Sequence, residues 1–526
     1  MTEQSNISQL SAQDAQFLYI QSATNLTHVM AVYIYDPSTA PGGKVRFKDI
    51  IEHMRKRMDV SPMFKRKLYR LPMDIDHPYW VKDENFDLEA HISHGRLPEP
   101  ADWRQFCIHV ARHHSKPLDM TRPLWDMYVL EGLDNIPGYA KGSYAIMTRI
   151  HHSTIDGVSG AHFFAAVSDK DPQGTPAILL PEGEPAANDL PTTSEILSRA
   201  INSTVTSPVK LAQALLKFAP ALLSSAQKSL AGGDEETATG VPQTRFNGPV
   251  TPHKMFDAIT FDLDELKKMR LKVGDATIND VVLTICSGAL RHYLAKHKEL
   301  PKDSLVAVAP VNARSRSGDE ANPGNNISAM TIKIWSNIAD PVKRLEAIRD
   351  TTRETKAAKS GLSARIMTDL TKHIPGVTMA GVARILTDER FAPKMSNLMV
   401  SNVPGPQIQL YMNGAKLTHQ YGLAPLAHGM GLFIAALSYN GSISFSIISD
   451  RKMMPDVEFF RECLQRAFNE LRDAKPNADV RPTKKTAVAP KEPVTPRDGS
   501  VMYRRVARKP RTVAAKASGG GKPKVK

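Results

Sequence analysis

The chain has 526 residues, of which 41% are hydrophobic and 23% charged, a composition typical of globular proteins with a sizeable core. This length exceeds one ordinary core and predicts two lobes or domains. The net charge of +14 suggests nucleic-acid binding, but residues 474–526 hold 15 of the Lys and Arg and only three of the Asp and Glu. The charge therefore belongs to a C-terminal tail, which argues against a folded core that reads nucleic acid.

The first residues are polar and lack the apolar segment of a secretory signal. No apolar run reaches the roughly 18 residues that a membrane-spanning helix needs. The closest run, 211–223, is interrupted by Lys217 and Pro220. We therefore expect a cytoplasmic protein.

Residues 1–190 show the patterns of mixed strands and helices and are predicted to form an N-terminal lobe. Ser11 and Asp14 mark the start of a capped helix. Apolar spacing and β-rich runs predict a strand at 27–35, helices at 47–58 and 103–114, strands at 127–130 and 143–150, and a helix at 157–168.

Residues 191–245 are interpreted as a helical crossover linker, and residues 246–472 as a C-terminal lobe. An Asn440-Gly441 pair between two apolar β-rich runs predicts a hairpin within 432–448. The remaining patterns predict helices at 261–273, 278–297, 343–359 and 457–472 and strands at 306–311, 330–335 and 398–403. Residues 473–526 are rich in Lys, Pro, Ala and Gly, which predicts a disordered basic tail.

The residues that carry chemistry follow the strand predicted at 143–150, in the run His151-His152-Ser-Thr-Ile-Asp156-Gly157. Continued as a strand, this segment would place His152 on the same face as Ile150. A histidine accepts protons near neutral pH with little tuning, so it suits a general base. Asp156 would cap the following helix or bind an arginine, for which Arg149 is one candidate.

Three other interpretations of these residues were weighed. A His-His pair with a nearby Asp also suits a metal site, but no further ligands at metal spacing follow, so we predict no metal. A purely structural pair is the second alternative. A Ser-His-Asp hydrolase is disfavoured because no Gly-x-Ser-x-Gly is present. The three cysteines match no disulfide or zinc spacing and are interpreted as reduced thiols: Cys107, Cys286 and Cys463.

The run at 151–157 matches the HHxxxDG motif of the chloramphenicol-acetyltransferase and condensation-domain superfamily. Two further blocks resemble, more specifically, the bacterial wax ester synthase/diacylglycerol acyltransferases: Pro123-Leu124-Trp125 and the Asn279-Asp280-Val281 run. Similar segments recur in order at 86–92, 325–328 and 401–406. The resemblance covers about residues 10–472 and leaves out the basic tail.

The resemblance implies an α/β (α+β) fold of two chloramphenicol-acetyltransferase-like lobes. Each would be a mixed β-sheet with flanking helices, with an active-site tunnel between them. It implies His152 as the general base, with His151 and Gly157 beside it and Asp156 in a structural role. It also implies that a second set of residues shapes the tunnel or binds substrate: Pro123, Leu124, Trp125, Asn279 and Asp280. For Trp125, core packing is an equally good interpretation.

The implied reaction moves a fatty acyl group from acyl-CoA, a substrate rather than a cofactor, to a long-chain alcohol or diacylglycerol. The products would be wax esters or triacylglycerols for storage, and no cofactor is expected. Two alternatives stay open: a condensation-type acyltransferase with a carrier-protein-bound donor, and a non-catalytic protein of a membrane or lipid-droplet surface. Peripheral association with the inner face of the membrane or with lipid droplets is expected, and nucleic acid would bind at most non-specifically through the tail.

Overall fold

The computed structural model describes residues 8–71, 76–154, 167–176, 241–312, 327–358 and 396–476. The chain divides into a compact unit, Met1–Val480, and a second unit, Arg481–Lys526. The tail beyond residue 476, most of the crossover predicted at 191–245, and both Asp156 and Gly157 lie outside the described residues.

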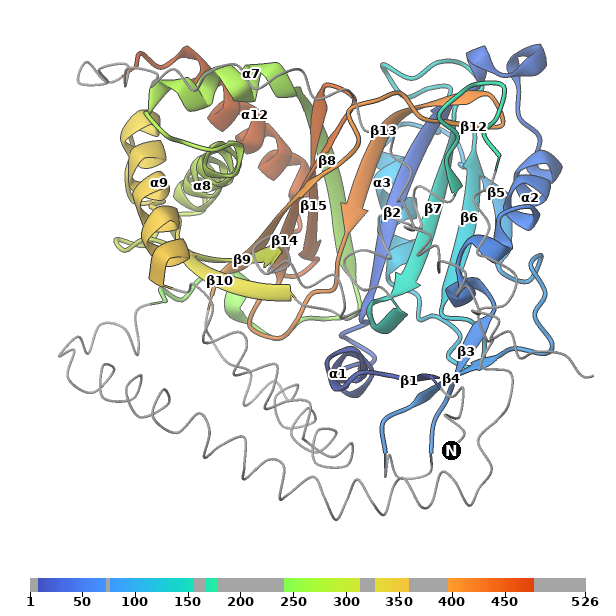
Figure 1. The fold of residues 1–526 in the computed structure, drawn as a ribbon. Helices are drawn as coiled ribbons and strands as arrows, with labels where there is room; N and C mark the ends of the chain where they lie inside the picture. Colours follow the sequence, from blue (N-terminus) through green and yellow to red (C-terminus); the bar gives the residue numbers. More distant parts are fainter. Residues whose placement is uncertain are drawn as a thin grey trace, which may run out of the picture. The chain divides into compact units, whose positions relative to one another are not determined.

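The first large sheet has the strand order β12-β13-β2-β7-β6-β5. Neighbouring strands are antiparallel except β5 and β6, which are parallel. Figure 1 shows this sheet with β2 and β7 at its centre. The strands are β2 (His28–Asp36), β5 (Ile92–Arg96), β6 (Trp125–Glu131), β7 (Tyr144–His151), β12 (Tyr411–Met412) and β13 (Ala415–Leu423).

Two helices cover opposite faces of this sheet, α2 (Phe47–Arg55) and α3 (Trp103–His114). Alternate residues of β2 enter two different cores. Val32 packs in the same cluster as Phe106 of α3, whereas Tyr33 packs in the cluster that contains Ile50 of α2. Because both faces are buried, β2 and β7 carry mostly apolar and aromatic side chains and show little alternation in sequence, with Thr148, Arg149 and His151 as buried polar exceptions in β7.

The second large sheet has the order β10-β9-β11-β14-β15-β8 and is mixed, because β11 runs parallel to both β14 and β9. Its strands are β8 (Lys254–Asp262), β9 (Val306–Asn312), β10 (Ile327–Lys333), β11 (Leu398–Pro404), β14 (Leu432–Tyr439) and β15 (Ser442–Asp450). Its helices are α7 (Leu263–Met269), α8 (Ile278–Lys296), α9 (Pro341–Ala358) and α12 (Val457–Asp473), which Figure 1 shows together on one side of it.

A third, small sheet has the order β1-β4-β3. Helix α1 (Ala12–Tyr19) follows β1, and its first turn is capped by Ser11, whose hydroxyl accepts from the Asp14 amide. The helix start predicted at Ser11–Asp14 is therefore confirmed. The three strands are β1 (Ser8–Gln9), β3 (Arg66–Tyr69) and β4 (Tyr79–Lys82).

One hairpin of the predicted C-terminal lobe belongs to the sheet of the N-terminal lobe, and we call it the exchanged hairpin. β12 and β13 lie within the predicted C-terminal lobe of 246–472, yet β13 pairs along its length with β2 of the N-terminal sheet. Gly414 lies in the tight turn between β12 and β13 with a φ of +80°, a conformation that a side chain would oppose. Sequence patterns did not reveal this exchange, because strand periodicity does not identify the partner strand.

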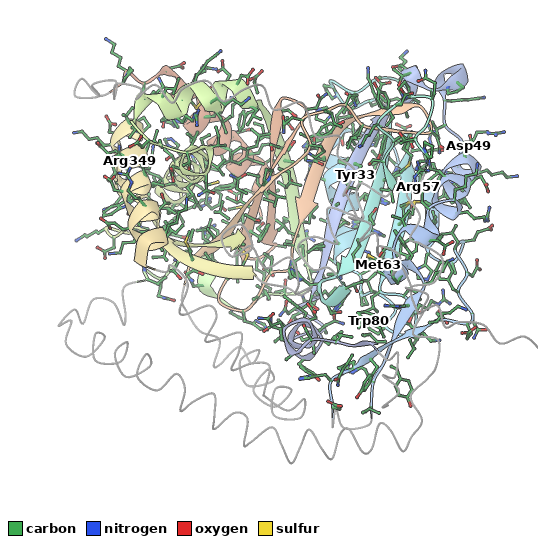
Figure 2. All side chains as sticks on the ribbon, viewed as in Figure 1. Tyr33, Asp49, Arg57, Met63, Trp80 and Arg349 are labelled. Carbon is green, nitrogen blue, oxygen red and sulfur yellow. The ribbon has the colours of Figure 1, made fainter. Side chains whose placement is uncertain are left out.

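A buried ion pair joins the segment 167–176 to Arg57, which follows the end of α2 and is labelled in Figure 2. The Asp169 carboxylate accepts from the Arg57 guanidinium and from the Thr175 amide at 3.0 Å. The Asp169 backbone exchanges two hydrogen bonds with Tyr411 of β12. Since Arg57 and Asp169 are both buried, losing either partner would strand a charge in the core.

The predicted α/β class with two mixed-sheet lobes is confirmed, and so is the hairpin at Asn440-Gly441, where both residues have positive φ. The helix predicted at 261–273 is wrong at its start. Phe261 and Asp262 end β8, and the helix begins at Leu263, capped by the Asp262 carboxylate. Short strands such as β1, β3, β4 and β5 gave no recognisable alternation and were not predicted.

Candidate active site

Strand β7 delivers the histidine pair to one end of the first sheet. All eight of its residues are buried, and the strand ends at His151. His152 opens a short 3-10 turn, His152–Thr154, and its backbone N–H donates to the Thr27 carbonyl at 2.9 Å. The strand therefore does not continue through His152 as expected, and the two imidazoles enter different surroundings.

His151 is fixed as a neutral ring by its partners. Its Nδ1 accepts from the Ser153 amide at 3.2 Å, and its Nε2 lies 2.7 Å from the Gln21 Oε1, which only accepts. The proton therefore sits on Nε2. Burial, with His28 and His152 nearby, lowers the His151 pKa to about 3. His151 consequently stays neutral and engaged on both sides at physiological pH.

His152 has a different neighbour, Phe17 of α1. The two rings stack with centroids 3.9 Å apart and an interplanar angle of 18°. Burial lowers the pKa of His152 below 6.5, so its imidazole is neutral near pH 7. A neutral imidazole can accept a proton, and the Phe17 ring restricts its rotation. Sequence patterns did not point to Phe17, because nothing in a lone helical phenylalanine indicates such a contact.

The predicted Pro123-Leu124-Trp125 block lies next to this site and contacts β7 and α1. The Leu124 carbonyl accepts from the His151 amide at 2.9 Å, and the Leu124 side chain packs under α1 with Leu18. Trp125 is 1% exposed and donates from Nε1 to the Phe64 carbonyl at 3.1 Å. Trp125 therefore packs in the core, the interpretation that the sequence left open, and the block positions β7 and α1.

Arg149 was one candidate partner for Asp156. Its guanidinium binds both oxygens of Asp126 and also donates to the His113 and Lys116 carbonyls. It is thus engaged by four acceptors within the described residues. Asp156 and Gly157 lie outside them, so their roles remain predictions.

Further histidines lie behind the pair and are held neutral. His28 faces His151 across the strands and donates from Nε2 to the His114 carbonyl at 2.9 Å. Burial and the Arg149 charge lower the pKa of His28 to about 4, and burial lowers that of His113 to about 3. The His114 pKa is also lowered well below 6.5. Neutral histidines thus lie behind the pair, and burial keeps His152 neutral as well.

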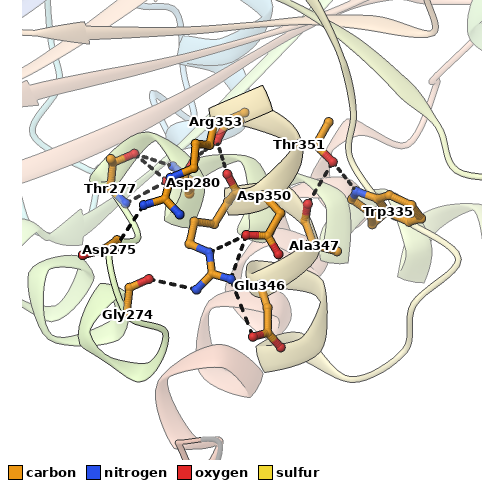
Figure 3. A network of polar contacts seen from close by, with 12 residues as sticks. Gly274, Asp275, Thr277, Asp280, Trp335, Glu346, Ala347, Asp350, Thr351 and Arg353 are labelled. Carbon is orange, nitrogen blue, oxygen red and sulfur yellow. Dashed lines mark hydrogen bonds and ion pairs between the residues drawn. The ribbon is translucent and has the colours of Figure 1, made fainter. Parts of the chain in front are cut away.

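Asn279 and Asp280 open α8 in the second half of the molecule. The Asp280 carboxylate accepts from the Thr277 amide and hydroxyl, both at 2.7 Å, and from the Thr352 hydroxyl at 2.7 Å. Figure 3 shows this capping box beside Arg353 and Asp275. These contacts commit the carboxylate to fixing the helix start. Asn279 is half-buried next to it, and a tunnel role for either residue remains a prediction.

No cysteine has the surroundings of a nucleophile. Cys107, Cys286 and Cys463 are buried, and burial raises the pKa of each thiol, that of Cys463 to about 12. Within the described residues, no three His, Cys, Asp or Glu side chains gather in a way that would hold a metal ion. The arrangement therefore offers a neutral imidazole, His152, and no reactive thiol among the described residues.

Comparison with known proteins decides the family. Residues 10–282 match the wax ester synthase/diacylglycerol acyltransferase catalytic domain, and residues 323–472 match the C-terminal domain of the same family. The chain belongs to this family. A Mycobacterium tuberculosis protein named as a diacylglycerol O-acyltransferase is 32% identical over 470 residues, which cover 88% of this chain and 89% of that protein. The predicted acyltransferase activity is confirmed.

Solved structures agree on the fold of this acyltransferase. The wax ester synthase/diacylglycerol acyltransferase of Marinobacter aquaeolei VT8 superposes with a TM-score of 0.62 at 24% identity, over 88% of this chain and 98% of that one. The starter condensation domain of rhizomide synthetase superposes with a TM-score of 0.50 at 13% identity, over 90% and 97%. The predicted relation to condensation domains is confirmed at the level of fold.

Sequence reasoning missed the residues that orient the pair. Phe17 and Gln21 come from α1 and the turn after it, and Thr27 comes just before β2. They contact residues more than 120 positions later in the chain. A single sequence holds no signal for such contacts. Only the capped start of α1 hinted that this segment was ordered.

Proposed function

We propose that His152 is the general base that transfers a fatty acyl group from acyl-CoA to the hydroxyl of a long-chain alcohol or diacylglycerol. The observation that carries the proposal is that the two histidines have different contacts. His151 has both ring nitrogens engaged and a pKa of about 3, so it serves as a fixed support. His152 is neutral and held against Phe17, ready to accept a proton.

In the proposed reaction, His152 takes the hydroxyl proton while the oxygen attacks the thioester carbonyl. A tetrahedral oxyanion forms and collapses to the ester, and the protonated His152 returns the proton to the leaving CoA thiolate. A positioned base of this kind contributes about 10²–10⁴-fold to the rate. No acyl-cysteine intermediate is needed, in keeping with the raised thiol pKa values, and no cofactor takes part.

The two substrates are assigned from relatives. The condensation domain with a similar fold was solved in complex with C8-CoA, which supports a CoA thioester as donor. The mycobacterial relative is named for diacylglycerol, and the Marinobacter protein for both wax ester and diacylglycerol chemistry. We propose that this chain accepts long-chain alcohols, diacylglycerols or both.

We further propose that the protein works at a lipid surface, either the inner face of the membrane or a lipid droplet. Both products are insoluble in water, and the basic tail of 474–526 would be attracted to anionic lipid at about 1 kcal/mol per residue near the surface. Among the described helices, none is long and apolar enough to span a bilayer. Deleting residues 474–526 should reduce flotation with anionic vesicles, and unchanged flotation would contradict this role of the tail.

The central experiment measures CoA thiol release from palmitoyl-CoA with hexadecanol, with dioleoylglycerol and with no acceptor. The native protein should release thiol only with an acceptor, and the better acceptor names the product. His152→Ala should lose this release, whereas His94→Ala, which removes an exposed histidine, should retain it. Activity of His152→Ala at the native level would refute the base assignment.

A further inference from the structure

An open groove lies between the segment that enters β8 and the turn that follows β15. It has a volume of about 590 Å³, and its walls include residues 248–251, Lys452 and Pro455. Because β8 begins where the antiparallel β15 ends, both walls lie at the same end of the second sheet. Most of the lining is uncharged, and Pro249 and Pro455 are exposed to solvent. The groove therefore offers apolar walls and few charged groups.

Arg451 and Lys452 bring positive charge to this groove. Both side chains are exposed, and within the described residues neither forms an ion pair. The carboxylate next to them in sequence, Asp450, is fully buried and accepts hydrogen bonds from the Thr251 amide and hydroxyl. It is therefore directed into the protein and does not pair with the two exposed cations.

Two further acidic groups near the groove are engaged by partners of their own. Glu299, which lines the groove, accepts from the Arg245 guanidinium through both carboxylate oxygens at 2.7 Å. Asp456, which precedes α12, accepts from the Tyr293 hydroxyl at 2.6 Å and from the His297 Nε2 at 3.0 Å. The charge that is left for a partner is therefore positive, which favours an anionic partner.

The groove lies at the same end of the molecule as the histidine pair. Lys254, the first residue of β8, donates from Nζ to the Thr251 carbonyl at 2.6 Å and to the Thr24 carbonyl at 3.4 Å. Thr24 precedes β2, whose first residue, His28, pairs with His151 of β7. Figure 1 shows β8 beginning at the same end of the molecule where β2 begins and β7 ends. A surface bound at the groove therefore faces this end of the protein.

From these observations we infer that Arg451 and Lys452 bind the phosphate groups of anionic lipids, so that the rim of the groove is the docking surface of the folded body. The inference rests on the proposed function for its choice of partner, because the acceptor alcohols and the ester products are lipids. Each basic residue close to an anionic lipid surface strengthens binding about fivefold. The exposed Pro249 and Pro455 carry no charge that contact with headgroups would desolvate. Docking here turns the end with the histidine pair toward the lipid that holds the acceptor.

The first test measures flotation of the full chain with vesicles of phosphatidylglycerol and phosphatidylcholine. The variant combines Arg451→Gln with Lys452→Gln, and it should bind these vesicles about thirtyfold more weakly than the native chain. The matched control combines Lys44→Gln with Lys48→Gln, which removes two exposed lysines that lie beyond the other end of β2. The control loses the same charge and should bind within about threefold of the native chain. An unchanged affinity in the first variant, or an equal loss in both, would overturn the inference.

A second measurement reports contact rather than charge. The three native cysteines are buried, so a nitrobenzoxadiazole label can be attached selectively to Pro249→Cys or, as a control, to Lys48→Cys. Phosphatidylglycerol vesicles should shift the emission of the label at position 249 to shorter wavelength and leave that at position 48 unchanged. An unshifted label at 249, or equal shifts at both positions, would place the docking surface elsewhere.

Thiol release from palmitoyl-CoA separates a failure of this inference from a failure of the proposed function. Vesicle binding that depends on Arg451 and Lys452, without thiol release by the native chain, would refute the proposed function and keep the docking surface. Thiol release by the native chain, with equal vesicle binding in all variants, would keep the function and overturn the surface. Calorimetric binding of inorganic phosphate that is lost in the Arg451→Gln, Lys452→Gln variant, with vesicle binding unchanged, would assign the two cations to a soluble phosphate and also overturn the inference.

Discussion

The end of β7 and the start of α8 both match motifs of the family, but the structure uses them differently. At the end of β7, side chains from α1, from the segment before β2 and from the turn after β7 converge on His151 and His152. At the start of α8, the Asp280 carboxylate accepts the hydrogen bonds of a capping box and of the Thr352 hydroxyl. A match to a family motif therefore locates a residue with a role in this fold. Only the contacts of that residue show whether its role is catalytic or structural.

The largest expected effect separates the two members of the histidine pair. His152→Ala should lower kcat/KM by about 10²–10⁴-fold with little change in the free energy of unfolding. His151→Ala should instead lower that free energy by about 1–3 kcal/mol, because it leaves buried partners unsatisfied. Kinetics and urea unfolding of both variants check this contrast. Equal losses of stability would remove the distinction between base and support.

The second prediction concerns pH and belongs to the β7 region. His28, His113 and His151 have folded pKa values of about 4, 3 and 3, below the unfolded value of 6.5. Between these values the unfolded chain binds protons that the folded chain does not, so stability is complete above pH 6.5 and falls as the pH drops.

Each of these histidines should lower the free energy of unfolding by about 1.4 kcal/mol per pH unit below 6.5. Together they should lower it by about 4 kcal/mol at pH 5.5. Urea unfolding at pH 7.5 and 5.5 measures this difference. His151→Gln should remove about one third of the dependence. A free energy of unfolding that stays constant over this range would show that the buried histidines are not held neutral.

The third prediction tests the α8 region. Asp280→Ala removes the acceptor for Thr277 and Thr352 and should lower the free energy of unfolding by about 2 kcal/mol. The kcat/KM measured well below the melting temperature should change by less than about threefold, because the carboxylate serves the helix cap. A loss of activity on the scale of His152→Ala without destabilisation would instead support the tunnel role that the sequence predicted.

The smallest expected effect is that of Phe17→Ala. Removing the ring exposes His152 to water, so the apparent pKa of the acidic limb in kcat/KM should rise toward 6.5. The rate at pH 8 should fall about tenfold because the imidazole loses its fixed orientation. Phe86→Ala, which removes another partly buried phenylalanine of the same sheet's core, is the control. An unshifted pH profile would mean that Phe17 only packs.

Much of the fold was predictable from local patterns. The Ser11 cap, the apolar spacing of α2 and α3, and the Asn440-Gly441 turn are features of neighbouring residues, and each was located close to its observed place. The histidine pair at the end of a strand was also located, because strand patterns are local, whereas for Trp125 the sequence left core packing and a tunnel wall equally open. The reaction class followed from the family resemblance rather than from the residues alone.

The features of the fold and the site that were not predicted depend on contacts between distant parts of the chain. The stacking of Phe17 on His152, the hydrogen bond of Gln21 to His151 and the Lys254 bridge to Thr24 each join segments separated by more than a hundred residues. Periodicity reports which face of an element is buried but not what covers it. The exchange of β13 into the first sheet escaped prediction for the same reason.

The exchanged hairpin also constrains how the protein is made. Thr418 of β13 donates to the carbonyl of Ile34 in β2, 384 residues earlier in the chain. On the ribosome, β2 therefore leaves the exit tunnel long before its outer neighbour is synthesised, and its edge stays open to pairing with other chains. An N-terminal half expressed alone would keep that edge exposed and should aggregate. Adding the segment 405–425 in trans would be the direct way to restore its solubility.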